Sequence, residues 1–215
     1  MREYPHIDYG TGIYGENVYA FDKLDGSNIR VEWNRRNAKK SAFTGGFTKF
    51  GTRTQIISKT NQHFGDSVDI FMDKYCDDIN EIFFKEKYFR NLERATLFLE
   101  YFGPSSFAGY HDLSEKKDVV LFDICTYKGD FLPPKIFVEY FGHLDIPEVI
   151  YIGNYNKELI QNIKNNTDLK EGVVCKGVRK HKGRDLVWMT KIKTNQWLDR
   201  LKNKYGEERL KEEFV

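Results

Sequence analysis

The sequence contains few cysteines and histidines, and their spacing argues against the common metal and disulfide frameworks. The three cysteines, Cys76, Cys125 and Cys175, are odd in number, far apart and free of C-x-x-C spacing. The five histidines form no H-x-x-x-H pair. We therefore expect neither a disulfide framework nor a transition-metal site built by the protein, so any metal is expected to arrive with the substrate.

Long apolar runs and targeting signals are also missing. No apolar stretch approaches the roughly 18 residues that span a bilayer, and the first ten residues, MREYPHIDYG, lack the basic and apolar regions of a signal peptide. No membrane partner is expected. We expect a cytoplasmic location, which a virus-encoded protein acting in its host would share.

The composition is that of a globular protein. Of the 215 residues, 40% are hydrophobic, 15% aromatic and 31% charged, a balance unlike that of disordered or fibrous chains. The length allows one sizeable core or two small ones. We expect a single domain over residues 1–215.

Charge is small in total but uneven along the chain. The net charge is +2, yet residues 176–215 carry 12 Lys or Arg against 6 Asp or Glu. Residues 66–86 are instead rich in acidic side chains. One basic face is predicted, and cations clustered beside a groove would favour a phosphate backbone, although such stretches are more often plain solvated surface.

Apolar and turn residues predict an α+β protein. Two extended segments within Val18–Trp33 predict a β-hairpin through the sequence DGSN, and a second hairpin is predicted around Gly45 and Gly46. An apolar stripe predicts a helix over Ser67–Phe89 with Asp66 or Ser67 as N-cap.

The remaining elements alternate between strands and helices. Strands are predicted over 96–102, 119–127, 149–152, 172–176 and 186–193, with a long loop over 103–118 and helices over 134–141 and 157–163. Thr194 or Asn195 is expected to cap a C-terminal helical tail over 194–215. Trp197 and Leu201 would pack this tail on the core, and its basic side, with Arg200, could touch nucleic acid.

The sequence KLDGSN places Lys23 at the end of a strand-like run, before an acidic-Gly turn. A lysine can act as a nucleophile only as the neutral amine, and its reference pKa is about 10.4, so desolvation and nearby cations must favour that form. The same four letters, K-x-D-G, also occur in ordinary hairpin turns with a surface lysine. The motif alone does not decide between these readings.

Four further segments make the motif around Lys23 more informative. In chain order they are LEYFG at 99–103, VVLFDI at 119–124, EGVV at 171–174 and KIK at 191–193. Together with KLDG, they resemble motifs I, III, IIIa, IV and V of the covalent nucleotidyltransferases, which comprise ATP-dependent DNA ligases, RNA ligases and mRNA capping enzymes. The resemblance covers nearly the whole chain.

This resemblance implies the α+β nucleotidyltransferase fold of ligase adenylation domains, which is ATP-grasp-like, with antiparallel sheets flanked by helices. Only 22 residues precede Lys23 and 22 follow Lys193. Because these segments are too short for the OB domain of DNA ligases and capping enzymes, we expect the catalytic domain alone.

The resemblance also implies a role for individual residues. Lys23 would form the covalent AMP adduct, Glu100 would accept hydrogen bonds from the ribose, and Asp25 with Glu171 would hold Mg²⁺ or Mn²⁺ through water. Lys191 and Lys193 are two apart in a strand, so both would meet the phosphates from one face. The implied nucleotide-binding set is Asp22, Lys23, Asn28, Arg53, Glu100, Val173, Lys191 and Lys193. Glu100 as a strand-edge salt bridge and Glu171 as a surface charge are the alternatives.

Three positions bear on the substrate. Asn28 stands where DNA ligases and capping enzymes typically carry arginine and where ligases of the RNA ligase 2 type carry Asn. Arg53 resembles the motif Ia arginine and could hold a phosphate bidentately. Val119 stands where the family usually has the aromatic residue that stacks on adenine. Val173 or Val174 could cover one purine face instead, while Phe122 is expected in the core.

The resulting hypothesis is an ATP-dependent RNA ligase that joins 5′-phosphate and 3′-hydroxyl ends. It would act through a lysyl-AMP intermediate and an adenylylated 5′ end, with strict dependence on a divalent ion. The alternatives are a minimal DNA nick ligase, a capping-type guanylyltransferase and a non-enzymatic nucleic-acid binder. RNA is the expected partner, with DNA or an RNA/DNA hybrid as the alternative, and a protein partner could replace the missing substrate-binding domain.

Overall fold

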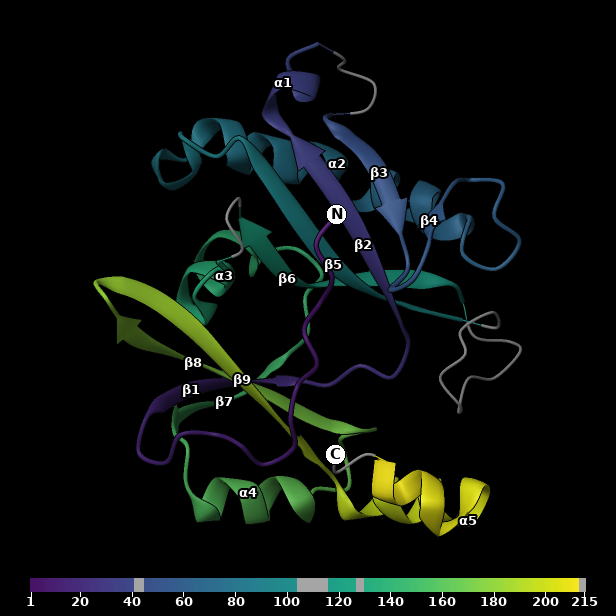
Figure 1. Ribbon diagram of the computed structural model, residues 1–215, viewed down its shortest axis with the longest axis vertical. Helices are drawn as coiled ribbons and strands as arrows, with labels where there is room; N and C mark the ends of the chain where they lie inside the picture. The colour runs from purple at the N-terminus through teal and green to yellow at the C-terminus, as the bar shows by residue number, and fades with distance from the viewer. Residues whose placement is uncertain (41–44, 104–115, 127–129, 213–215) are drawn as a thin grey trace. The chain divides into compact units, whose positions relative to one another are not determined.

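The computed structural model describes residues 1–40, 45–103, 116–126 and 130–212, and it divides into two compact units. Unit 1 comprises residues 1–4, 25–132 and 136–146, and unit 2 comprises residues 5–24, 133–135 and 147–215. Each unit has its own antiparallel sheet (Figure 1). The α+β class and the antiparallel sheets expected from the sequence are confirmed, whereas the single domain over 1–215 stays a prediction.

Unit 1 is built on a five-stranded sheet in the order β4-β3-β2-β5-β6. The strands are β2 (Ser27–Asn34), β3 (Phe47–Gly51), β4 (Ile56–Ile57), β5 (Arg94–Phe102) and β6 (Asp118–Thr126). The helices are α1 (Arg35–Ala38), α2 (Asp66–Lys85) and the 3₁₀ turn η1 (Lys87–Phe89), while α3 (Pro134–Phe141) begins in unit 2 and ends in unit 1. The strands predicted over 96–102 and 119–127 correspond to β5 and β6, and the predicted helix corresponds to α3.

Helix α2 packs on one face of this sheet through aromatic side chains. The ring centre of Phe83 lies 4.8 Å from that of Trp33, and Phe71 lies 4.9 Å from Phe47. The predicted stripe is therefore confirmed, but the predicted N-cap is wrong. Gly65 occupies the cap position, because the Ser67 hydroxyl donates to the Phe64 carbonyl instead of accepting a bond from the helix.

The hairpin predicted over Val18–Trp33 is also wrong. β1 (Asn17–Asp22) pairs with strands of unit 2, whereas β2 pairs with β3 and β5 of unit 1. The DG sequence thus serves as a crossing between two sheets. It needs glycine, because a Cβ at Gly26 would lie 2.7 Å from the Tyr101 carbonyl oxygen. Alternating apolar residues showed that both segments are extended but not which strands they join.

The second predicted hairpin exists, but its turn lies further along the chain. β3 and β4 pair through Phe50 and Ile57, and Thr52 and Gln55 close the turn. Gly45 and Gly46 precede β3 rather than forming its turn. Residues 41–44 of this segment, and residues 104–115 of the predicted long loop, lie outside the described residues.

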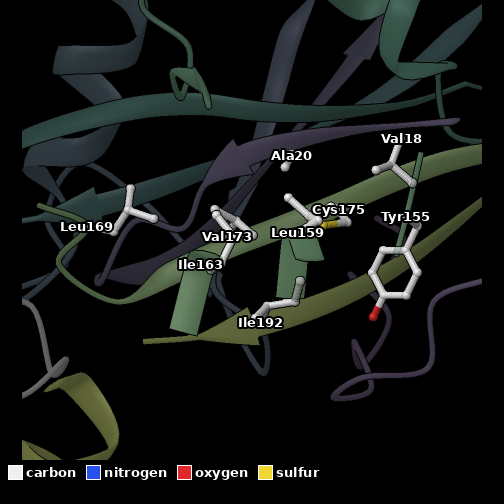
Figure 2. Packing of buried hydrophobic residues seen from close by; sticks show 9 residues of the cluster. All are labelled: Val18, Ala20, Tyr155, Leu159, Ile163, Leu169, Val173, Cys175 and Ile192. Atoms are coloured by element: carbon white, nitrogen blue, oxygen red, sulfur yellow. The ribbon is translucent and has the colours of Figure 1, made fainter. Parts of the chain in front are cut away.

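Unit 2 is built on a four-stranded sheet in the order β7-β1-β8-β9. Its further elements are β7 (Val149–Asn154), α4 (Lys157–Lys164), β8 (Gly172–His181), β9 (Arg184–Lys193) and α5 (Asn195–Glu212). Helix α4 covers one face of the sheet, where Leu159 and Ile163 pack against Ala20, Val173 and Ile192 (Figure 2). Alternate residues of each strand therefore face this core and the others face away from it.

The predicted cap of the tail is confirmed. The Thr194 hydroxyl accepts a hydrogen bond from the Trp197 backbone at 3.1 Å and so starts α5. Trp197 and Leu201 are buried, and Gly206, with a φ of +85°, interrupts the helix. Among the described residues, no helix has the length and apolar character needed to cross a membrane.

We predict that Leu159→Ala will lower the free energy of unfolding by about 2–5 kcal/mol, because the side chain is buried in the core of unit 2 and its loss leaves a cavity. The matched control is Ile152→Ala, which truncates an exposed side chain of β7 and should change that free energy by less than about 0.5 kcal/mol. Urea unfolding followed by circular dichroism measures both. Equal effects would contradict the assigned core.

Candidate active site

The candidate site in unit 2 is organised by the start of strand β8. The Lys23 backbone N–H, just beyond β1, donates to the Gly172 carbonyl at 2.9 Å. Gly172 is in turn the register partner of Lys193 on β9. Two lysines are thus fixed on either side of Glu171, the residue that precedes β8.

The side chains of these residues meet at one carboxylate oxygen. Lys23 Nζ lies 2.8 Å from Glu171 Oε1, and Lys193 Nζ donates to the same oxygen. Glu171 is only 3% exposed. Its other oxygen, Oε2, is buried and has no hydrogen-bond partner within the described part of the chain. The site therefore holds one carboxylate between two ammonium groups and keeps one acceptor unused.

The charge state of Glu171 follows from these contacts. Burial by itself raises the pKa of the carboxyl, but the positive charges and hydrogen bonds of Lys23 and Lys193 outweigh burial, so the pKa is lowered from 4.5. Glu171 is therefore ionised at neutral pH. The prediction that these three residues belong together is consistent with this geometry.

Lys193 has a second contact that the sequence did not reveal. Its Nζ lies 3.6 Å from the ring centre of Trp197, a cation–π arrangement. Trp197 was assigned only to packing, because an aromatic residue in the first turn of an amphipathic helix normally fills a core. The signal available in the sequence was its position four residues after Lys193, across the Thr194 cap.

The register of β8 and β9 separates two faces. Lys191 pairs with Val174 and Lys193 with Gly172, so both lysines lie on one face, as predicted. Val173 instead pairs with Ile192 and is fully buried in the α4 core. The structure therefore does not place Val173 with the lysines. Val174, the alternative considered for the purine, is the valine on their face.

Asp22, the residue before Lys23, has a partly buried carboxyl group that lies near other negative charges. Burial raises the pKa of its carboxyl, and the negative charges of Glu148 and Glu171 raise it further. Its Oδ1 atom is buried without a hydrogen-bond partner among the residues described. Asp22 therefore has an acceptor that a ligand donor or a cation could satisfy.

In unit 1, two residues predicted to bind nucleotide are direct neighbours. Asn28 on β2 is the register partner of Glu100 on β5, although 72 residues separate them in the sequence. They lie on the sheet face opposite Trp33 and α2, because side chains alternate along a strand. Asn28 Oδ1 is buried and lacks a hydrogen-bond partner in the described chain.

Arg53 lies in the turn between β3 and β4 and is exposed. Its carbonyl accepts a hydrogen bond from the buried Arg30, which also donates to the carbonyls of Thr52 and Arg2. Arg30 thus holds the turn that carries Arg53, a role that the sequence analysis missed. Asp25, two residues after Lys23, begins the main segment of unit 1.

Neighbouring residues of β6 also point to opposite faces of the sheet. Val119 is buried as the register partner of Tyr101, while Val120 is the partner of Glu100. Val119 therefore does not share the face of Glu100. Phe122, expected in the core, is half-buried and packs edge-on against Tyr4.

Tyr4 was also missed by the sequence analysis. Its hydroxyl donates to Asp123 Oδ2 at 2.9 Å. Burial, followed by the charge of Asp123, raises the pKa of the Tyr4 phenol well above 10. The phenol therefore stays protonated and acts as a donor that fixes the N-terminal residues on this face. Nothing in the composition of residues 1–4 indicates this contact.

The two antiparallel sheets and the Lys23–Glu171–Lys193 group define a catalytic domain of the nucleotidyltransferase type. Residues 13–193 match the family model described as RNA ligase. The chain belongs to the RNA ligase family.

Solved structures agree on the fold. A mutant of the Naegleria gruberi RNA ligase with ATP and Mn is 16% identical, with a TM-score of 0.64 over 95% of this chain and 59% of that one. Another mutant of the same ligase with AMP and Mn is 17% identical, with a TM-score of 0.59 over 89% and 53%. This chain therefore spans little more than half the length of these ligases. A search of curated proteins found no significant match.

We predict that Glu171→Gln will lower the free energy of unfolding at pH 7 by about 3–5 kcal/mol, because it leaves two ammonium groups without their carboxylate. The folded pKa of Glu171 lies below 4.5. Its stabilisation is therefore complete above pH 4.5 and is lost as the pH falls through the lowered value. Urea titrations from pH 7 to pH 3 should show a smaller acid loss in the variant. If the free energy of unfolding fell equally with pH in the wild type and the variant, the ion-pair assignment would be contradicted.

Proposed function

We propose that this chain is an ATP-dependent RNA ligase domain in which Lys23 forms a covalent bond to AMP and passes it to an RNA 5′-phosphate. The observation that carries the proposal is the contact of Lys23 and Lys193 with the buried Glu171 carboxylate, in an RNA ligase family member. Two similar ligase structures were solved with ATP or AMP and Mn, which supports ATP as the co-substrate here.

In the first step, Lys23 Nζ attacks the α-phosphorus of ATP. A phosphorus–nitrogen bond forms, the bond to the bridging oxygen breaks, and pyrophosphate leaves. The Lys23 ammonium group must first release a proton to solvent water, and in the resting state Glu171 Oε1, at 2.8 Å, stabilises the protonated form. Lys191 and Lys193, on one strand face, would stabilise the charge that develops on the phosphates.

A divalent ion fits the acceptors that remain. Among the described residues no group of three or more His, Cys, Asp or Glu could hold a metal alone. Glu171 Oε2, however, is buried and unused, and Asp25 follows Lys23 by two residues. We propose that these carboxylates hold Mg²⁺ or Mn²⁺ through its water molecules. Such an ion, when bound, would neutralise phosphate charge and favour the neutral Lys23 amine.

The second and third steps complete the ligation. AMP moves from Lys23 to the RNA 5′-phosphate, and the 3′-hydroxyl then displaces AMP as the strands join. We propose that Glu100 binds the ribose of AMP and that Asn28, its cross-strand neighbour, accepts a hydrogen bond from nucleotide or RNA. Arg53, on a turn fixed by Arg30, would bind a phosphate.

We predict that the protein will gain the mass of one AMP after incubation with ATP and a divalent ion, and that Lys23→Arg will not. Arginine keeps a cation beside Glu171, so the ion pair survives while the nucleophilic amine is lost. The matched control is Lys85→Ala, which removes an exposed lysine paired with Glu81 and should label fully. Intact-protein mass spectrometry measures all three. Labelling of Lys23→Arg, or labelling in EDTA, would refute this step.

A ligation panel then separates the competing substrates. The labelled protein should join splinted RNA ends in preference to splinted DNA ends, and it should accept ATP but not GTP. Preference for nicked DNA would instead establish a DNA ligase, and labelling by GTP would establish a capping-type enzyme. If neither nucleotide formed a covalent adduct, the remaining alternative would be a non-enzymatic nucleic-acid binder.

We predict that Asn28→Ala will lower RNA ligation about tenfold or more without lowering stability. The buried Oδ1 has no partner in the described chain, so its removal should leave the free energy of unfolding unchanged or raise it by up to about 1 kcal/mol. The control Asn162→Ala removes an exposed amide from α4 and should change neither quantity. Urea unfolding and single-turnover ligation measure the two effects. A loss of stability that matches the loss of activity would contradict a ligand-binding role.

A further inference from the structure

We infer that the outer part of the β8–β9 hairpin, residues 178–187, is an arm that binds the phosphate backbone of the RNA substrate. This inference rests on the proposed ligase function and adds to it the surface that holds the RNA strand. It starts from a feature that the ATP chemistry does not use, namely a basic segment far along the strands that carry Glu171 and Lys193.

The arm is a two-stranded ribbon that extends beyond its sheet. Strand β1 pairs with β8 only as far as Gly177. From Val178 onward β8 pairs with β9 alone, up to the pair His181 and Arg184 (Figure 1). Lys182 and Gly183 close the ribbon in two residues with φ values of +47° and +77°. Positive φ at both turn positions matches the twist of the strands, so the tip is well defined.

The arm concentrates positive charge on exposed side chains. Residues 178–187 contain Arg179, Lys180, Lys182 and Arg184 but one acidic residue, Asp185. This excess within ten residues is larger than the net charge of +2 on the whole chain. Only Lys180 forms an ion pair, with Asp185 at 2.5 Å, when the described residues are considered. Three cations therefore remain available for a polyanion.

The C-terminal tail, by contrast, has no excess of positive charge. Residues 195–215 carry five Lys or Arg and five Asp or Glu. Lys202 is paired with Glu207, and Arg200 donates to the Lys170 carbonyl. The basic excess of residues 176–215 is thus carried by the hairpin. Charge favours the arm over the tail as the surface that meets RNA.

The chemistry of the arm fits nucleic acid better than a protein partner. The centres of protein interfaces are depleted in charge and enriched in aromatic side chains. Among the described residues, the large exposed apolar side chains lie elsewhere, as at Tyr14, Ile152 and Tyr205. Arginine guanidinium groups bind phosphate through two parallel hydrogen bonds. Arg179 and Arg184, both exposed, supply that chemistry.

The length of β9 gives the position of the contact on the substrate. Arg184 and Lys191 are seven residues apart on this strand, which corresponds to about 23 Å at roughly 3.3 Å per residue. Strand alternation places Arg179 and Arg184 on the face opposite Lys191 and Lys193. The arm should therefore contact a part of the RNA that lies beyond the ends being joined, at about this distance along the strand.

The test compares two variants that lose the same charge. Arg179→Gln/Arg184→Gln changes the arm, and Lys87→Gln/Arg90→Gln changes two exposed cations of unit 1, one in η1 and one directly after it. Fluorescence anisotropy measures the Kd for a nicked RNA duplex as KCl is varied. We expect the arm variant to bind about tenfold more weakly at low salt and the slope of log K against log salt to fall by about two. The control and the self-adenylylation of both variants should match the wild type.

The length of the duplex supplies a second readout. With flanks of about 12 base pairs the arm variant should show its defect, and with flanks of about four base pairs the variant and wild type should bind alike, since the RNA then ends before the arm. If RNA binding weakened equally in both variants, or did not change in the arm variant, the proposal that the arm binds RNA would be overturned. Loss of self-adenylylation in the wild type would instead overturn the proposed function, because that step needs no RNA.

Discussion

The buried carboxylate of Glu171 sets the arrangement of the side chains around it. An ionised group with so little exposure is tolerated only when opposite charges contact it, and here Lys23 and Lys193 do so at one oxygen. The backbone holds this arrangement, since the Thr194 N–H donates to the Glu171 carbonyl. Gly172 must be glycine, because a Cβ there would lie 2.1 Å from the Ile192 carbonyl oxygen.

The ion pairs of Glu171 contribute more to the proposed reaction than to the stability of the fold. A buried ion pair usually stabilises a fold no more than apolar side chains of the same size would, because removing both charges from water offsets their attraction. In the proposed function, its value is that the lysines are already ordered before ATP binds. The Trp197 ring adds to this order, since it faces the Lys193 ammonium from α5. The first turn of the tail therefore belongs to the site.

The sequence predicted which residues come together better than it predicted how they are arranged. The resemblance of short motifs to the nucleotidyltransferases pointed to Lys23, Glu171 and Lys193, and the structure brings these three side chains into contact. Strand partners and faces were harder, because alternation shows that a segment is extended but not what lies on either side. Val173 was favoured over Val174 only because the side covered by α4 was unknown. The contacts of Tyr4 and Trp197 depend on tertiary packing that no local pattern records.

The crossing at residues 23–26 sends the two ends of one short motif into different sheets. Had the DG sequence formed a hairpin, β1 and β2 would lie in one sheet and their functional residues would share its face. Instead, Lys23 directly follows β1 of unit 2, while Asn28 lies on β2 of unit 1, where β5 brings Glu100 beside it. A one-residue slip of β2 against β5 would turn Asn28 to the α2 side. Gly26 lies close against the Tyr101 carbonyl of unit 1, where a side chain would not fit, so the start of this unit depends on glycine at that position.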